Sequence, residues 1–533
     1  MPTARKPPIA ARRFSTPYGS RVRLAALSVA LLLGVIAPGS AQPAADGAPG
    51  AEATALRQRV AALELELRAL RLQLSEAQQT APSATARRAS SEEAAVADDG
   101  AAAPAPTVEE RLEALDQQIR ILGRQAELER EQAAEAARRA PIVDAGRNGF
   151  GLRSADGAFN FRLRGLVQVD SRFFLDDERS TAADTFLARR VRPMVQGTLF
   201  KQVEFRFTPD FGSGATVIQD AYADVTFSPA ARLRGGKFKS PFGLERLASA
   251  SDLMFIERGA PTLVAPNRDL GFMLFGDVLG GTTSYAVGIF NGVPDNGLTD
   301  GDDGDGKDGA ARIFVQPFRK SQNTAISGLG VGAAATYGIA NGTVAAPGLA
   351  VYRTTGNLVF FRYRSDASAA GTSVADGERA RVSGQGYYYS GRFALLAEQA
   401  YSRQRVTRVT ATTDVGVNAW QVAGSWVLTG EPASYRAVTP RHNLDPARGY
   451  WGAFEVVARY MGWSLDDDVF PVFADPAVSA RRVRAWTVGL NWYLSPVLKI
   501  VADFEEARFK GGAPAGGDRP TGHDMFTRLQ VAF

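Results

Sequence analysis

Apolar and polar residues alternate with a period of two over most of the chain after Pro141. In residues 159–174, FNFRLRGLVQVDSRFF, the residues Phe161 and Leu163 share one side of an extended chain, and Arg162 and Arg164 share the other. The same alternation returns in KQVEFRFTPDF, NLVFFRYRSD, GAFEVVARYMGW and VRAWTVGLNWYL. We count about 16 such segments, joined by short turns or by long polar loops, and each predicts a β-strand.

The last segment, MFTRLQVAF, carries the same pattern up to Phe533. An edge strand of a secreted soluble β-protein alternates in the same way, so one segment does not separate the two classes. Many strands of about 10 residues, joined alternately by short turns and long loops, are typical of a transmembrane barrel, because only a closed sheet satisfies its backbone in lipid. We therefore predict an all-β transmembrane barrel of about 16 antiparallel strands over residues 146–533.

The six tryptophans and a run of three tyrosines lie mostly near predicted strand ends, where amphipathic rings suit the two membrane interfaces. They are Trp420, Trp426, Trp451, Trp463, Trp486, Trp492 and Tyr387 to Tyr389.

Residues 42–145 show a different period. Apolar residues recur every three or four positions at Leu56, Val60, Leu63, Leu67, Leu70 and Leu74, and again at Val108, Leu112, Leu115, Ile119, Leu122 and Ala126. Thr107 and Glu110 form a capping box before the second run. This heptad pattern predicts an α-helical coiled coil with other copies of the chain, and a hairpin of the two helices across their Ala/Pro/Ser-rich linker is the alternative. We expect this region to act as a periplasmic spacer or oligomeriser, with a contact to peptidoglycan left open.

Residues 1–41 have the composition of a signal peptide. Six basic residues and no acid accompany an apolar stretch, residues 24–37, that is shorter than the roughly 20 residues needed to span a bilayer. Small residues then suit cleavage before Gln42. The rest of the chain holds 55 basic and 56 acidic residues, so the formal charge of +5 does not indicate a nucleic-acid partner.

Few residues are available for catalysis or metal binding. The chain has no cysteine and only two histidines, His442 and His523, so neither a thiolate nor an imidazole metal site is expected. No convincing pair of nucleophile and base is present either. We therefore expect neither an enzyme nor a cofactor.

Arginines gather on the polar side of the predicted strands. Arg189 shares a face with Leu187 and Val191, whereas the polar side carries Arg162, Arg164, Arg172, Arg190, Arg192, Arg206, Arg362 and Arg364. Since a barrel of about 16 strands encloses an aqueous channel, inward guanidinium groups can replace part of an anion's hydration shell. They can equally form ion pairs with acids such as Glu204 and Asp224, and the residue types alone do not decide between the two.

Residues 150–533 resemble the phosphate-selective porins O and P. The resemblance is strongest in FLARRVRPMVQGTLFKQVEFRFTPDFG, in QDAY, GKFKSPFGLE and FIERG in this order and spacing, and in GIFNG. It implies a homotrimer of 16-stranded barrels in the bacterial outer membrane. In each barrel an inward-folded loop forms a constriction whose arginines and lysines bind phosphate or polyphosphate.

The resemblance also implies roles for single residues. Arg189 and Arg190 match the family's paired arginines, Asp220 its acid in QDAY, and Arg258 the arginine of the constricting loop. Further basic positions in or beside this segment are Lys237, Lys239, Arg246 and Arg268. Strand parity places Arg190 and Arg192 in the channel and Arg189 on the other face, unless a β-bulge resets it.

The favoured function is passive diffusion of small anions such as phosphate through this channel. A general diffusion pore is one alternative, and a barrel that only anchors the coiled coil is the other.

Overall fold

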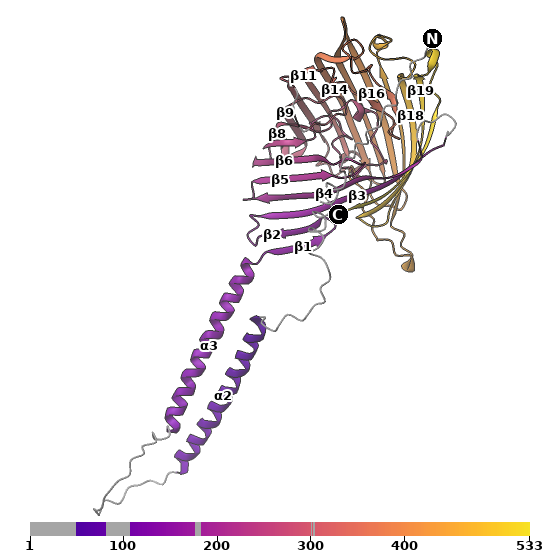
Figure 1. The fold of residues 1–533 in the computed structure, drawn as a ribbon. Coiled ribbons are helices and arrows are strands. Elements are labelled where there is room, and N and C mark those ends of the chain that lie inside the picture. Colours follow the sequence, from indigo (N-terminus) through magenta and orange to yellow (C-terminus); the bar gives the residue numbers. More distant parts are fainter. Residues whose placement is uncertain (1–48, 81–106, 176–182, 300, 302–303) are drawn as a thin grey trace, which may run out of the picture. The chain divides into compact units, whose positions relative to one another are not determined.

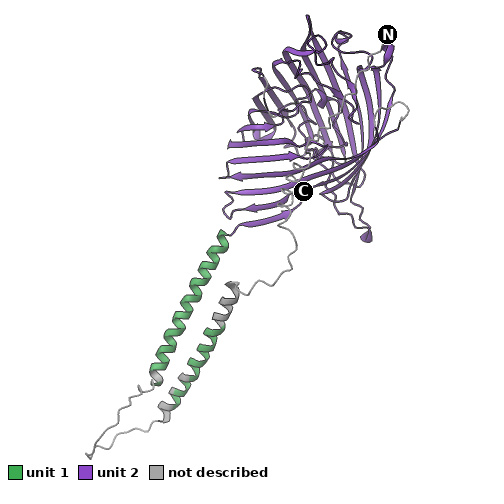
Figure 2. Ribbon diagram, in the orientation of Figure 1, with its two compact units in different colours: residues 1–139 green, residues 140–533 purple. Residues whose placement is uncertain are grey.

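The computed structural model describes residues 49–80, 107–175, 183–299, 301 and 304–533. The predicted signal peptide lies outside these residues. The chain forms two compact units, residues 1–139 and 140–533 (Figure 2). The observed boundary follows residue 139, six residues before the predicted boundary after residue 145. The predicted boundary falls at the end of a short strand, β1 (Ile142–Gly146).

The first unit contains two helices, α2 (Pro49–Thr80) and α3 (Val108–Arg139). The predicted capping box is present, since the Thr107 backbone N–H donates to Glu110 Oε2 at 2.9 Å and the Glu110 N–H donates to Thr107 Oγ1 at 3.3 Å. The two helices contact each other, Arg71 and Asp116 form an ion pair at 3.8 Å between them, and Leu67 of the heptad seam is buried. The helices thus pair within one chain, which is the hairpin alternative. Neither helix, nor any other among the described residues, combines the length and the apolar content that crossing a bilayer requires.

Within the described part of the second unit, sixteen antiparallel strands pair in a closed ring (Figure 1). In ring order they are β3 (Asn160–Phe174), β4 (Thr185–Leu199), β5 (Val203–Asp210), β6 (Val217–Ser228), β7 (Ala231–Phe238), β8 (Asp269–Val278), β9 (Thr283–Phe290), β10 (Asp308–Val315), β11 (Leu329–Asn341), β14 (Val374–Ser390), β15 (Phe393–Arg408), β16 (Ala411–Val427), β17 (Ala453–Leu465), β18 (Ala480–Tyr493), β19 (Leu498–Gly511) and β20 (Gly522–Ala532). The predicted barrel and its strand number are therefore confirmed.

Smaller elements lie at the barrel's ends or inside it. They are β1, β2 (Gly149–Arg153), α4 (Pro261–Val264), α5 (Thr324–Ser327), β12 (Tyr352–Arg353), β13 (Val359–Phe361) and the 3₁₀ turns η1 (Leu279–Gly281), η2 (Pro446–Arg448), η3 (Asp467–Val469) and η4 (Pro514–Gly516).

The ring closes between the last strand and the first. Strand β20 pairs with β3 from Asp524 opposite Phe174 to Ala532 opposite Leu166. Phe533 and Gly165 then exchange two backbone hydrogen bonds, of 2.9 and 3.0 Å. The Phe533 ring covers Gly165, since a Cβ added there would lie 2.5 Å from the ring. Glycine at position 165 therefore leaves room for the ring of Phe533.

Exposure alternates along the barrel strands. On β15, Leu395 and Tyr401 are 39% exposed, whereas Ala394 and Ala400 are fully buried. The exposed face is apolar and suits lipid, and the other face is covered by chain segments inside the barrel. The predicted period of two is confirmed.

Two connections between strands fold into the barrel. The first inward loop, residues 239–268, is held to the wall by the Ile256 N–H, which donates to Asp503 of β19 at 2.7 Å, and by the Leu244 N–H, which donates to Glu398 of β15 at 2.8 Å. The second inward loop, residues 342–373, is held by the Tyr352 hydroxyl, which donates to Asp295 at 2.9 Å.

The second inward loop corrects two predictions. NLVFFRYRSD is not a barrel strand, because β13 pairs only with β12 inside this loop. Trp463 is only 2% exposed and packs against Tyr352 and Phe360 with ring centroids 4.8 Å away, so it is not part of an interfacial girdle. Both faces of β17 carry apolar residues, and the pattern alone therefore did not indicate which face is inner.

Candidate functional site

A cavity of about 690 Å³ lies inside the barrel between strand β4, the two inward loops and strands β17–β19. Eight arginines and three acids line it, so positive charges exceed negative charges by five. The arginines are Arg172, Arg189, Arg190, Arg192, Arg246, Arg258, Arg268 and Arg353, and the acids are Asp210, Glu257 and Glu505.

A β-bulge in β4 brings two consecutive arginines to the same side. Gln168 of β3 pairs with Arg190 and the next residue, Val169, pairs with Ala188, which leaves Arg189 as the extra residue. The expectation for Arg189 allowed for such a bulge, and the bulge resets the strand parity so that Arg189 lines the same cavity as Arg190. Gly212 packs behind the bulge, where a Cβ would lie 2.6 Å from the Arg189 carbonyl oxygen.

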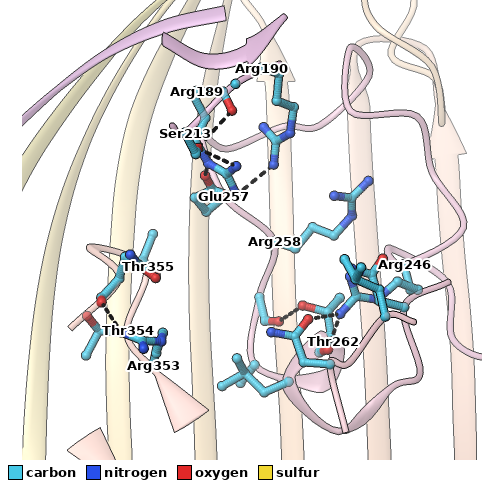
Figure 3. A pocket seen from close by; sticks show the side chains of 18 of the residues that line it. Arg189, Arg190, Ser213, Arg246, Glu257, Arg258, Thr262, Arg353, Thr354 and Thr355 are labelled. Atoms are coloured by element: carbon cyan, nitrogen blue, oxygen red, sulfur yellow. Dashed lines mark hydrogen bonds and ion pairs between the residues drawn. The ribbon is translucent and has the colours of Figure 1, made fainter. Parts of the chain in front are cut away.

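Arg189 and Arg190 converge on Glu257 of the first inward loop (Figure 3). The distances to its carboxylate are 2.5 Å from Arg189 Nε and 3.1 Å from Arg190 Nη2. Arg172 and Arg528 approach the same carboxylate at 3.2 and 3.7 Å. Burial by itself raises the pKa of Glu257, but the charges of Arg190, Arg189 and Arg528 outweigh it and hold this pKa well below its usual value. Glu257 is thus a permanent anion within a cationic group.

Two arginines of the first inward loop lack an acidic partner. Arg258 donates to the carbonyl oxygens of Glu245 and Ala248, at 2.9 and 2.8 Å. Arg246 donates to the Thr262 carbonyl and to Asn296 Oδ1. No carboxylate of the described residues lies within ion-pair distance of either guanidinium. In Figure 3, the Arg258 side chain lies between those of Glu257 and Arg246.

The charge of these two guanidinium groups persists at neutral pH. Burial lowers the pKa of Arg258 to about 10, opposed by the charge of Glu245 and reinforced by the charge of Arg268. Burial, reinforced by the charges of Arg258 and Arg268, lowers the pKa of Arg246 to about 9. Both values stay above neutrality, so both guanidinium groups are positively charged at neutral pH.

Six of the residues singled out from the sequence line the cavity together. They are Arg189, Arg190, Arg192, Arg246, Arg258 and Arg268. Arg192 pairs with Asp210 at 2.7 Å. Asp220 does not line the cavity, but it accepts a hydrogen bond from Arg268 at 3.2 Å and so orients that guanidinium.

The remaining predicted residues lie elsewhere. Arg162 pairs with Asp144 at 3.4 Å, and Arg206 donates to Gln196 at 2.8 Å. Lys239 donates to the Leu247 and Ala248 carbonyls of the first inward loop. Lys237 is buried and Arg164 is half-buried, and neither is among the residues that line the cavity.

Five charged residues of the cavity were not among the predicted site residues, and three of them carried a usable signal; the five are Arg172, Asp210, Glu257, Arg353 and Glu505. Arg172 has the same strand parity as Arg162 and Arg164, Glu257 directly precedes Arg258, and Asp210 lies in the TPDFG motif. Arg353 lines the cavity from the second inward loop, where no periodic sequence pattern predicts which way its side chain points.

The described residues contain no group of three or more histidine, aspartate or glutamate side chains arranged to hold a metal ion.

A closed sixteen-stranded barrel with an apolar outer face and a loop folded into its lumen is an outer-membrane porin. Residues 161–533 match the family model of the phosphate-selective porins O and P, and the chain belongs to this family.

The chain is also similar to one curated relative and to several solved structures. Porin O of Pseudomonas aeruginosa is 26% identical over 435 residues, which cover 74% of this chain and 93% of the relative. Among solved structures, the outer-membrane channel DcaP of Acinetobacter baumannii matches with a TM-score of 0.47 and 13% identity over 72% of this chain and 99% of its own. The anion-selective porin of Comamonas acidovorans matches with a TM-score of 0.44 and 10% identity over 70% of this chain and all of its own.

Proposed function

We propose that the protein is a passive outer-membrane channel that favours small anions, with phosphate or polyphosphate as ligands of the arginine-lined cavity. The observation that carries this proposal is the excess of five positive charges around one cavity inside the barrel. A fixed cationic lining attracts anions and repels cations, and guanidinium groups donate in a geometry that matches phosphate oxygens.

The arrangement also supports release of the ion. Conduction requires a site that binds strongly enough to recruit an ion and weakly enough to let it leave. Glu257 already occupies donors of Arg189 and Arg190, so an incoming phosphate competes with a built-in carboxylate. We infer that this competition keeps the affinity moderate.

Family membership gives the proposal independent support, since the family is described as phosphate-selective and its relative Porin O belongs to the same class of channel. By the same reasoning we propose a homotrimer in the outer membrane, with the helical hairpin in the periplasm and available to peptidoglycan.

Planar-bilayer recording tests the channel. We expect a reversal potential in a KCl gradient that indicates chloride preference, and block of the chloride current by added phosphate. A general diffusion pore would show neither chloride preference nor phosphate block. A barrel that serves only as an anchor would pass no steady current.

The variant Arg189→Gln tests the site. The Arg189 side chain is 27% exposed, so a passing ion can reach it, and loss of its charged donors is expected to weaken phosphate block about tenfold. Arg403→Gln is the matched control, because Arg403 of β15 carries the same charge on the outer face, where its side chain is 57% exposed beside Asp414. Equal phosphate block in both variants would show that the cavity is not the site that selects phosphate.

A further inference from the structure

The cavity has a second wall that is apolar. Six side chains form it, namely Phe360 of the second inward loop, Met461 and Trp463 of β17, Val483 and Ala485 of β18, and Ala507 of β19. Each is at most 8% exposed. Trp463 lies opposite Val483 in the sheet, Met461 opposite Ala485, and Ala485 opposite Ala507, so the patch is continuous across three strands.

The six side chains belong to a buried hydrophobic core that also packs the second inward loop, and they form a part of this core that borders the cavity. The lumen of an outer-membrane barrel is generally polar, because it is filled with water. An inorganic phosphate would contact the arginines and gain nothing from Met461 or Trp463. The cavity volume of about 690 Å³ instead falls in the range of pockets that enclose small organic ligands.

Several buried donors at the cavity lack an acceptor. Trp463 Nε1 has no hydrogen-bond partner among the described residues, and the same holds for the Nε atoms of Arg172, Arg190 and Arg246. Gln219 Oε1 is the one unpartnered acceptor among the described residues that line the cavity. An indole N–H is a donor only, and a buried donor without a partner costs free energy. These donors are covered by the protein itself, and Trp463 Nε1 is the one of the four that belongs to the apolar wall.

We propose that the cavity selects amphipathic organic anions, in which a phosphate or carboxylate head binds the arginines and an apolar or aromatic body lies against the wall of Met461, Trp463 and Val483. This proposal rests on the proposed anion channel and specifies its substrate class. The apolar wall adds affinity in proportion to the apolar area that the ligand buries.

Block of the chloride current by methyl phosphate and by phenyl phosphate provides the test. At mildly alkaline pH both esters are dianions, so they differ in their apolar body and hardly in charge. Burial of part of the phenyl ring is expected to lower the half-blocking concentration about tenfold relative to methyl phosphate.

Two substitutions that conserve side-chain volume test whether the apolar wall causes the stronger block by phenyl phosphate. Met461→Gln and Val483→Thr make the wall polar without removing an arginine, and we expect the ratio of the two half-blocking concentrations to fall toward one while block by methyl phosphate changes less than about twofold. Val501→Thr is the control, because Val501 is an inner, buried residue of β19 that packs beside Ile256 and Phe526, outside the cavity. Its ratio should stay at the wild-type value.

The outcomes separate this inference from the proposed function. If the wild-type channel prefers chloride and is blocked by phosphate, but both esters block equally, the apolar wall only packs the second inward loop and the inference is overturned. An unchanged ratio in both wall variants would overturn it as well. If the channel shows no anion preference and none of the three phosphates blocks it, the proposed function itself fails.

Discussion

Glu257 is the residue on which the charge balance of the cavity depends. Its carboxylate lies within 3.7 Å of four arginines, two of them adjacent on the bulge of β4. Removing one partner of such a buried network changes both its charge and its hydrogen bonding. The role of Glu257 as a competitor for phosphate can therefore be tested by an isosteric change.

Glu257→Gln is expected to tighten phosphate block roughly threefold to tenfold and to lower the single-channel conductance, because freed arginine donors turn to the ion and retain it longer. Titration of the chloride current with phosphate measures both effects. Glu506→Gln is the matched control, because Glu506 pairs with Arg508 and does not line the cavity. Weaker block in Glu257→Gln would mean that Glu257 positions the arginines for the ion and does not compete with it.

Arg189 shows how a single inserted residue changes an inference from strand parity. Its sequence neighbours Leu187 and Val191 indicate an outward side chain, but the extra residue in β4 directs it to Glu257. The motif that contains the two arginines can be recognised in the sequence. The bulge cannot, because it depends on the pairing register between β3 and β4. The family resemblance therefore gave the better expectation for this residue.

At the scale of elements, the seam between β3 and β20 decides whether the barrel closes. The contact of Phe533 with Gly165 fills the space beside a glycine and adds two backbone hydrogen bonds. Phe150 packs against the same ring with centroids 6.0 Å apart. A side chain at position 165 would displace Phe533 from this seam.

Gly165→Val is expected to lower the temperature at which the folded barrel converts to the unfolded form by several degrees, since the new side chain collides with a ring that completes the closing pair. The shift between the two forms on a detergent gel measures this temperature. Gly384→Val is the control, because Gly384 lies on the outer face of β14 with no atom within 4 Å of an added Cβ. Equal transition temperatures for the two variants would show that the Phe533 contact does not stabilise the seam.

The whole molecule consists of two units that are expected to be separable in function. Because α2 and α3 contact each other and bury Leu67 within one chain, part of the hairpin's seam is covered without other copies. The barrel unit closes through its own strands. Assembly into trimers is therefore expected to rest on the barrel.

Deletion of residues 42–139 is expected to leave a conducting, anion-preferring channel that still runs as a trimer in native mass spectrometry, since the strands from β1 onward remain intact. Bilayer recording and the measured mass check the two parts of this prediction. A conducting monomer would show that the helices hold the copies together, and a loss of all current would show that the barrel needs the first unit to fold or insert.

The sequence by itself determined the barrel, the inner and outer faces of its clearest strands, and the presence of arginines on the inner face. It could do so because a period of two is a local property of an extended chain, and because a bilayer admits such a chain only in a closed sheet. The tertiary structure decided the direction of Arg189, the inner position of Trp463, the contribution of Arg353 and the pairing of α2 with α3. These four features depend on strand register, on loops that fold into the lumen and on contacts between residues far apart in the chain. A local sequence pattern does not predict such contacts.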